Sequence, residues 1–162
     1  MKIGIVGGGE GWHRRRLEAA FVGRGLEVQY FPVTRLRSSL MTQAEQICSG
    51  GKSLLDCHTL MIRTIPGGSL EQIIFRMDVL RRLQDYGLTI YNSPLTIERT
   101  VDKYYTSSLL AAAGLPTPPS VVTEDYHEAV AAFHKLGGDI VVKPLFGSLG
   151  KGIVAASLGT LL

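Results

Sequence analysis

Short apolar segments alternate with amphipathic segments over the first part of the chain, which is typical of strands joined through helices. The segments predicted to be strands are 2–6, 28–33, 60–62 and 88–91. Helices are predicted over 12–22 and 70–86, each lying between two of these strands and followed by a glycine that ends it. Such connections favour an α/β fold with a doubly wound parallel sheet, which we assign to residues 1–93.

The helix predicted over 70–86 has a clear start signal, because Ser69 and Gln72 have the spacing of a capping box. Ile73, Met77 and Leu80 share one face of it, and Ile74 is expected beside them. The preceding stretch, 34–53, is polar and has no clear period. We expect a loop there, with at most one helical turn.

The pattern changes after residue 93, where shorter elements and a proline-rich connector appear. Asp102 is predicted to cap a helix, and the prolines of 115–119 form a stiff linker. The predicted helices are 94–99, 103–113 and 125–136, and the predicted strands are 120–122, 139–144 and 153–156. This order is typical of a small α+β unit with a glycine-rich hairpin tip, and we assign it to residues 94–162.

Composition and charge narrow the class of protein. Hydrophobic residues make up 45% of the chain and charged residues 19%, which is enough to form a core. No apolar run approaches the roughly 20 residues of a membrane span, and the start does not resemble a signal peptide. Cys48 and Cys57 have no metal-ligand spacing, so reduced thiols and a cytoplasmic location are expected.

The positive charge is confined to the first half of the chain. Residues 1–82 carry 12 Lys and Arg against 7 Asp and Glu, whereas residues 83–162 carry 5 against 7. The one tight basic run, 14–16, points in three directions on a helix and forms no stripe with interleaved aromatic residues. Nucleic-acid binding is therefore not favoured, and no membrane partner is expected.

Two lysines and a glycine-rich loop are the first candidates for chemistry. The loop contains Gly147, Ser148, Leu149, Gly150, Lys151 and Gly152. It lacks the Ser or Thr that follows the lysine of a P-loop, so it is either a flap that closes over phosphates or a turn without a ligand. Lys143, in an apolar strand, either reaches solvent or binds phosphate, and Lys103 begins a helix beside Asp102.

These segments together resemble the ATP-grasp superfamily, and in particular its RimK-type α-L-glutamate ligases. The resemblance is carried by the segments 92–94, 101–103, 109–118, 140–144 and 147–152, and by Gly11, Trp12, His13, Leu17, Ala20 and Phe21. It extends over essentially the whole chain. The order of the two lysines and the loop makes it specific.

The resemblance implies roles for these residues. Lys103 corresponds to the first nucleotide lysine of the family and Lys143 to the second, and 147–152 corresponds to the flap over the β- and γ-phosphates of ATP. It also implies that ATP phosphorylates a carboxylate and that the amine of glutamate, or of a similar amino acid, then displaces the phosphate. The acceptor carboxylate belongs to a protein tail or to a small molecule.

The family binds Mg²⁺ through acidic residues and an Asn of a second lobe. No Asp, Glu or Asn follows Ile153. We therefore expect a pre-ATP-grasp domain over 1–93 and the first ATP-grasp subdomain over 94–162, with the second subdomain absent. On this interpretation the chain is truncated, lacks ligase activity alone, and self-associates as a homo-oligomer through the surface left open.

Other residues are candidates for substrate contact. Arg63 follows the third predicted strand, where doubly wound sheets bind ligands, although a structural ion pair is equally consistent. The glycine-rich turn at 7–11, His13 and the basic run at 14–16 are candidates for the acceptor site, although a solvated helix start explains His13 as well.

Two other functions remain open. One is a non-catalytic nucleotide-binding or assembly module. The other is a Rossmann-type oxidoreductase that uses the turn at 7–11, but Trp12 occupies the place of the last glycine of the fingerprint. Glu27, the available acidic residue, precedes the second strand instead of ending it.

Overall fold

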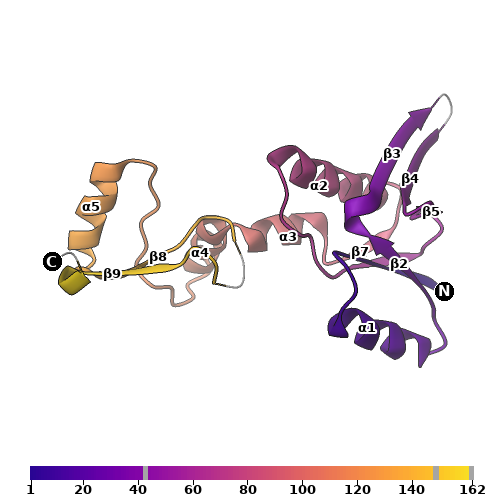
Figure 1. Ribbon diagram of the computed structural model, residues 1–162, viewed down its shortest axis with the longest axis horizontal. Coiled ribbons are helices and arrows are strands. Elements are labelled where there is room, and N and C mark those ends of the chain that lie inside the picture. The colour runs from indigo at the N-terminus through magenta and orange to yellow at the C-terminus, as the bar shows by residue number, and fades with distance from the viewer. Residues whose placement is uncertain (42–43, 148–149, 161–162) are drawn as a thin grey trace. The chain divides into compact units, whose positions relative to one another are not determined.

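The computed structural model describes residues 1–41, 44–147 and 150–160, without the side chain of Thr160 (Figure 1). Backbone contacts divide the chain into two compact units, Met1–Pro94 and Leu95–Leu162. Each unit has its own sheet and helices, and each is described separately.

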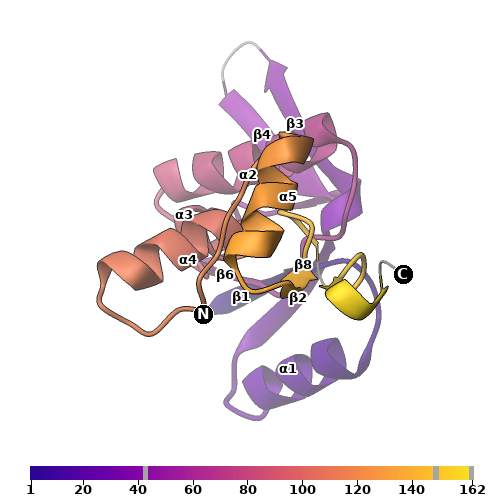
Figure 2. The same ribbon diagram turned by 90° about the vertical axis from the view of Figure 1, so that its left-hand side faces the viewer.

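The first unit is built on a parallel sheet. In the described residues, the sheet has the strand order β2-β1-β6-β7. The strands are β1 (Lys2–Gly7), β2 (Glu27–Pro32), β6 (Thr59–Ile62) and β7 (Thr89–Tyr91). Helices α1 (Trp12–Val22) and α2 (Leu70–Asp85) lie on opposite faces of this sheet in both views (Figure 1, Figure 2). The predicted doubly wound parallel sheet is confirmed.

Side chains of β1, β2, β6 and α2 form the core of this unit. Its fully buried side chains include Ile5, Val6, Phe31, Leu60, Leu80 and Leu83. Gly4 lies in the middle of β1, where a Cβ atom would stand 2.5 Å from Leu60 Cδ2 and 2.8 Å from Phe31 Cε2. A glycine is therefore required for these two side chains to close over the strand.

Helix α2 begins with the predicted capping box. The backbone N–H of Gln72 donates to Ser69 Oγ at 3.3 Å, and that of Ser69 donates to Gln72 Oε1 at 3.1 Å. The apolar face differs from the prediction at Ile74, which is 49% exposed. The buried positions of α2 are 76, 77, 79, 80 and 83, a stripe that leaves Ile74 on its outer side.

The sequence predicts a loop over 34–53 with at most one helical turn. One helical turn is present, at Val33–Arg35, but the prediction of a loop is wrong for the residues that follow it. Residues 36–53 form a separate antiparallel sheet of β3 (Leu36–Met41), β4 (Ala44–Ser49) and β5 (Lys52–Ser53). The hairpin buries few side chains, mainly Ile47 and Ser49. Its sequence therefore lacks the alternation of a strand with one face in a core.

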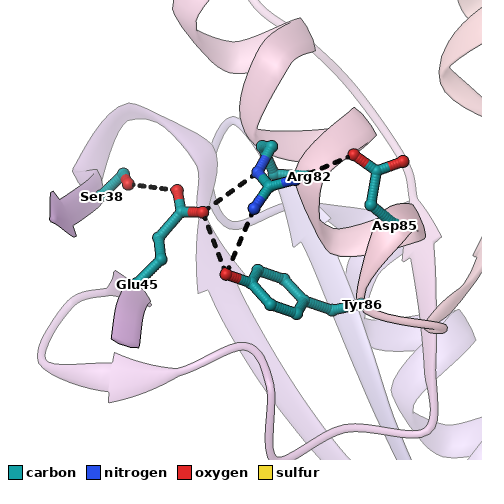
Figure 3. Close-up of polar contacts among 5 residues, drawn as sticks. All are labelled: Ser38, Glu45, Arg82, Asp85 and Tyr86. Carbon is teal, nitrogen blue, oxygen red and sulfur yellow. Dashed lines mark hydrogen bonds and ion pairs between the residues drawn. The ribbon is translucent and has the colours of Figure 1, made fainter. Parts of the chain in front are cut away.

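A polar cluster joins this hairpin to α2 (Figure 3). Glu45 on β4 accepts hydrogen bonds from Ser38 Oγ at 2.6 Å and from Arg82 Nε at 3.1 Å. The Tyr86 hydroxyl also donates to Glu45, at 3.3 Å, and Arg82 Nη1 donates to Asp85 at 3.1 Å. The Glu45 side chain is only 8% exposed, and these hydrogen bonds compensate for the loss of water around its carboxylate.

The second unit combines helices with a two-stranded hairpin. Its elements are α3 (Pro94–Val101), α4 (Lys103–Ala112), α5 (Tyr126–Lys135), β8 (Asp139–Val142), β9 (Val154–Ser157) and the 3₁₀ turn Leu158–Thr160. Strands β8 and β9 pair antiparallel. Asp102 caps α4 through Tyr105 N–H and Asp125 caps α5 through Glu128 N–H, both at 2.9 Å. The α+β character predicted for this region is confirmed.

The predicted strand over 120–122 is wrong, because this segment is not paired with a strand in the described residues. Val121 and Val122 are 50% and 57% exposed. A β-rich composition does not form a strand where no neighbouring strand supplies the hydrogen bonds. The described part of the chain contains no helix that is both long and apolar enough to cross a membrane.

Candidate functional site

In the second unit, Lys103 lies against the glycine-rich loop that follows β8. Its ammonium donates to the carbonyl oxygens of Leu145 at 3.3 Å and Gly147 at 3.1 Å. The backbone N–H of Lys103 also reaches the Leu145 carbonyl, at 3.4 Å. Because an ammonium has three donors, one remains for an anion at this position.

The glycines of the loop are required by its geometry. Gly147, Gly150 and Gly152 have φ values of +151°, +72° and +74°. A Cβ atom would stand 3.5 Å from Pro144 Cγ at Gly147, and 3.3 Å from it at Gly152. The loop thus folds around Pro144 in a conformation that other residues rarely adopt. Ser148 and Leu149, predicted members of the flap, lie outside the described residues, and Lys151 is exposed.

Lys143 follows the last residue of β8 and is exposed. The strand before it is open, with Val141 and Val142 at least half exposed. Among the described residues, no side-chain hydrogen bond or ion pair involves its ammonium. The nucleotide role of Lys143 stays a prediction, as does that of Lys103.

In the first unit, a cavity of about 270 Å³ opens at the carboxyl ends of β1 and β6. We call it the strand-end cavity. It is lined mainly by residues 7–11, His13, Arg14, Tyr30, Arg63 and Thr64. The strand order reverses between β1 and β6, and ligands of open α/β sheets bind at such a point. His13 and Arg63, both candidates for substrate contact, therefore line one cavity.

Tyr30 and Thr64 hold the glycine-rich turn of this cavity in place. The Tyr30 hydroxyl lies 2.9 Å from the Gly7 carbonyl and 3.2 Å from the Gly9 carbonyl. Gly8 N–H donates to Thr64 Oγ1 at 2.9 Å. Sequence reasoning missed both residues, although Tyr30 lies in the second half of β2 and Thr64 follows β6 by two residues, next to Arg63.

Arg14 is the member of the basic run that enters the site. Its guanidinium lies 3.7 Å from the centre of the Tyr30 ring. Its Nε donates to Glu18 at 2.8 Å, and Nη1 is 3.5 Å from Glu10. Arg15 and Arg16 are exposed and do not line the cavity.

A buried arginine supports the loop after β6. Arg76 on α2 is 6% exposed, and its Nη1 donates to the Pro66 carbonyl at 2.7 Å. The loop that Arg76 holds begins directly after Arg63 and includes Thr64. The sequence gives no signal for this role, because Arg76 reads as a polar position on an amphipathic helix.

Structural contacts or burial account for Glu27, Cys57 and His58. Glu27 starts β2, and its carboxylate lies 3.5 Å from Lys2 Nζ, away from the carboxyl end where a dinucleotide ribose would bind. Cys57 is buried, and burial raises the pKa of its thiol. His58 Nδ1 accepts from the backbone N–H of Lys2. The described residues contain no group of three or more His, Cys, Asp or Glu side chains able to hold a metal ion.

Comparison with curated proteins finds several ligases. The chain is 36% identical to a tetrahydromethanopterin:α-L-glutamate ligase of Methanosarcina acetivorans, over 98% of this chain and 50% of that protein. It is 29% identical to the ligase of the same name from Methanococcus maripaludis, over 95% of this chain and 51% of that protein. The chain thus spans about half the length of these curated relatives. No family model matches it.

Comparison with solved structures finds ATP-grasp proteins. The ATP-grasp ligase PsnB, complexed with a minimal precursor, Mg and ADP, matches 99% of this chain with 59% of its own, at 26% identity and a TM-score of 0.68. A RimK domain ATP-grasp protein from Sphaerobacter thermophilus matches 99% of this chain with 55% of its own, at 19% identity and a TM-score of 0.73. The second match shows similarity of fold.

Proposed function

We propose that this chain, which belongs to the RimK-like ATP-grasp ligases, takes part in the ATP-dependent joining of glutamate, or a similar amino acid, to an acceptor carboxylate. The related ligases of Methanosarcina and Methanococcus are named for the transfer of α-L-glutamate to tetrahydromethanopterin. The acceptor of this chain is a small molecule or the tail of a protein.

The observation that carries the nucleotide part is the contact of Lys103 with the loop around Pro144. Its ammonium is held by two carbonyl groups and keeps one donor for a phosphate oxygen. We propose that Lys103, Lys143 and the flap residues Gly147, Ser148, Leu149, Gly150, Lys151 and Gly152 bind ATP. The lysines neutralise phosphate charge, and the glycines let backbone N–H groups face an anion.

The reaction class follows from the chemistry of a carboxylate, which is a poor electrophile because it is anionic and lacks a leaving group. An acceptor carboxylate oxygen attacks the γ-phosphorus of ATP, and ADP leaves. The amine of glutamate then attacks the acyl carbon, phosphate leaves, and the nitrogen loses a proton. The part proposed for this chain is positioning and charge neutralisation.

Magnesium belongs to this chemistry in the family, and the PsnB complex contains it. The described residues do not offer a set of ligands for it, so we derive no step through the metal. We also propose that the 162-residue chain does not release ADP in response to glutamate, since it aligns with about half of each curated relative.

The nucleotide proposal is tested by calorimetric titration of the chain with ATP, in EDTA and in excess Mg²⁺. Lys103→Gln and Lys143→Gln are each expected to weaken binding about tenfold, the effect of losing one charged hydrogen bond. Lys135→Gln, an exposed lysine at the end of α5, is the matched control and leaves the affinity unchanged. Equal affinities for all four proteins would refute the assignment.

The same protein, incubated with ATP, Mg²⁺ and glutamate, is expected to release no ADP. Release of ADP that depends on glutamate would show that the 162 residues are sufficient for the activation step.

A further inference from the structure

A second cavity, of about 260 Å³, adjoins the strand-end cavity in the first unit. We call it the hairpin cavity, because residues of the turn before β3 and of the β4–β5 turn line it. Its lining includes Gln29, Arg35, Ser49 and Lys52. Arg14 and Tyr30 line both cavities, so the stacked pair forms a wall common to the two.

The hairpin cavity is cationic. Arg35 and Lys52 line it, and no carboxylate does so among the described residues. Both side chains are exposed, and the contact of Lys52 Nζ is with the neutral Gln29 amide, at 3.2 Å. Arg35 has no ion-pair partner in the described part of the chain.

The strand-end cavity also has a cation without a carboxylate partner, although one carboxylate lines it. Glu10 supplies its carboxylate, and this group is engaged by Arg14 at 3.5 Å. Arg14 is also paired with Glu18, so its charge is largely compensated. Arg63 is therefore the cation left for a ligand in the strand-end cavity, whereas Arg35 and Lys52 serve the hairpin cavity.

We propose that the acceptor carries two separate anionic groups, carboxylate or phosphate, and that each cavity binds one of them. The inference rests on the proposed function, since it describes the acceptor of the same ligase. One group lies in the strand-end cavity beside Arg63. The other group lies beyond the Arg14–Tyr30 wall, beside Arg35 and Lys52. The part of the acceptor between its two anionic groups passes over this wall. A single small anion would leave one of the two cationic cavities unused.

The test is calorimetric titration of the whole chain, without ATP, with probes that carry one or two anionic groups. The phosphate series is 6-phosphogluconate, with a phosphate and a carboxylate at opposite ends, against glucose 6-phosphate and gluconate. The carboxylate series is octanedioate and decanedioate against their monoamides. In at least one series, the probe with two anionic groups is expected to bind about tenfold more tightly than either probe with one.

Substitutions then assign the two groups to the two cavities. Arg63→Gln, and separately Arg35→Gln combined with Lys52→Gln, are each expected to remove the tenfold advantage of the probe with two anions. Arg15→Gln, which removes a neighbouring cation of α1 outside both cavities, is expected to preserve it. Thermal melting of each variant checks that the fold is intact. Because all these residues except Arg63 are exposed, folding is expected to survive.

The proposal is overturned if no probe with two anions exceeds its single-anion analogues in either series, or if Arg15→Gln reduces affinity as much as the cavity variants do. Loss of the advantage in Arg63→Gln alone would also overturn it, since the hairpin cavity would then have no part. None of these measurements involves ATP. Failure of the nucleotide titration with unchanged acceptor binding would count against the proposed function alone.

Discussion

The guanidinium of Arg14 stacks on the ring of Tyr30 at 3.7 Å, while the hydroxyl of the same ring reaches the Gly7 and Gly9 carbonyls. Tyr30 thus contacts the first turn of α1 with its face and the turn after β1 with its edge. The cation–π contact and the hydrogen bonds each contribute on the order of 1 kcal/mol. A single side chain of β2 thus fixes the wall of both cavities.

Tyr30→Phe tests the hydrogen-bonding half of this arrangement. The ring remains under Arg14, but the Gly7 and Gly9 carbonyls lose their donor, so we expect the free energy of unfolding to fall by about 1 kcal/mol. Urea titration measures the change. Tyr126→Phe, at an exposed position on α5, serves as the control and should leave stability unchanged. An unaltered midpoint for Tyr30→Phe would show that the turn does not depend on the hydroxyl.

Gly4→Ala introduces a methyl group where no space exists. Its Cβ atom would come within 2.5 Å of Leu60 Cδ2, and the surrounding core must shift to accept it. We expect a loss of about 1–3 kcal/mol in the free energy of unfolding, measured by urea titration. Gly67→Ala is the matched control, because a Cβ atom added there would have nothing within 4 Å and its φ is not positive. Equal stabilities would mean that the core between β1 and β6 is loosely packed.

Local signals in the sequence predict much of this fold. Helix α1 matches its predicted bounds, and the Ser69 capping box is present as expected. Such features depend on neighbouring residues, so the sequence records them. The β3–β4 hairpin depends instead on the two strands finding each other and on Glu45 reaching Arg82 on a distant helix. No periodic pattern encodes a contact of that kind.

The residues of the candidate site also fall into two groups, those that local sequence signals predict and those that only the fold reveals. His13 and Arg63 are recognisable because they follow predicted strands or begin a predicted helix. Tyr30 and Arg76 act through carbonyl groups distant in sequence, Gly7 for the first and Pro66 for the second. Their residue types are equally common in unrelated positions. Only the folded chain identifies them as supports of the strand-end cavity.

The polar cluster of Figure 3 makes stability depend on acidic pH. The hydrogen bond from Ser38, together with those from Arg82 and Tyr86, lowers the pKa of Glu45 against the opposing effect of burial. A carboxyl whose pKa is lower in the folded state stabilises the fold above its unfolded pKa, which is about 4.3. That contribution is lost as the pH falls through the folded pKa.

Glu45→Gln is therefore expected to reduce the unfolding temperature at pH 7, and the difference from the native chain should shrink as the pH falls below about 4. Thermal melts at a series of pH values measure this. Glu124→Gln, at an exposed position shortly before α5, separates the cluster from a general effect of removing a carboxylate. A difference that stays constant down to pH 3 would contradict the role of ionised Glu45.

The two thiols are expected to react at different rates. Burial raises the pKa of Cys57, so both access and thiolate formation are reduced, whereas Cys48 is partly exposed on β4. Iodoacetamide at pH 8, followed by mass spectrometry of peptides, should label Cys48 well before Cys57. In 6 M guanidinium chloride, where the chain is unfolded, the two cysteines should be labelled at similar rates. Faster labelling of Cys57 in the native chain would contradict its burial.

Self-association remains a prediction for the second unit, where β8 and β9 expose apolar side chains. Val141, Val142 and Val154 are each at least half exposed. Exposed apolar patches favour association, so sedimentation velocity should show a mass that rises with protein concentration. Val142→Lys places a charge on this surface and should shift the distribution toward monomer. A monomer at every concentration for the unaltered chain would refute the prediction.

The reversal of strand order between β1 and β6 has a consequence for specificity. The strand-end cavity is a product of chain topology, and most of its lining lies outside the buried core, with Ile5 as a member of both. If the acceptor binds as proposed, replacements at positions such as 13 and 63 alter molecular recognition while leaving the scaffold's packing largely intact. A framework of this kind can be retuned for new acceptors by altering its rim, with folding and selectivity adjusted almost independently.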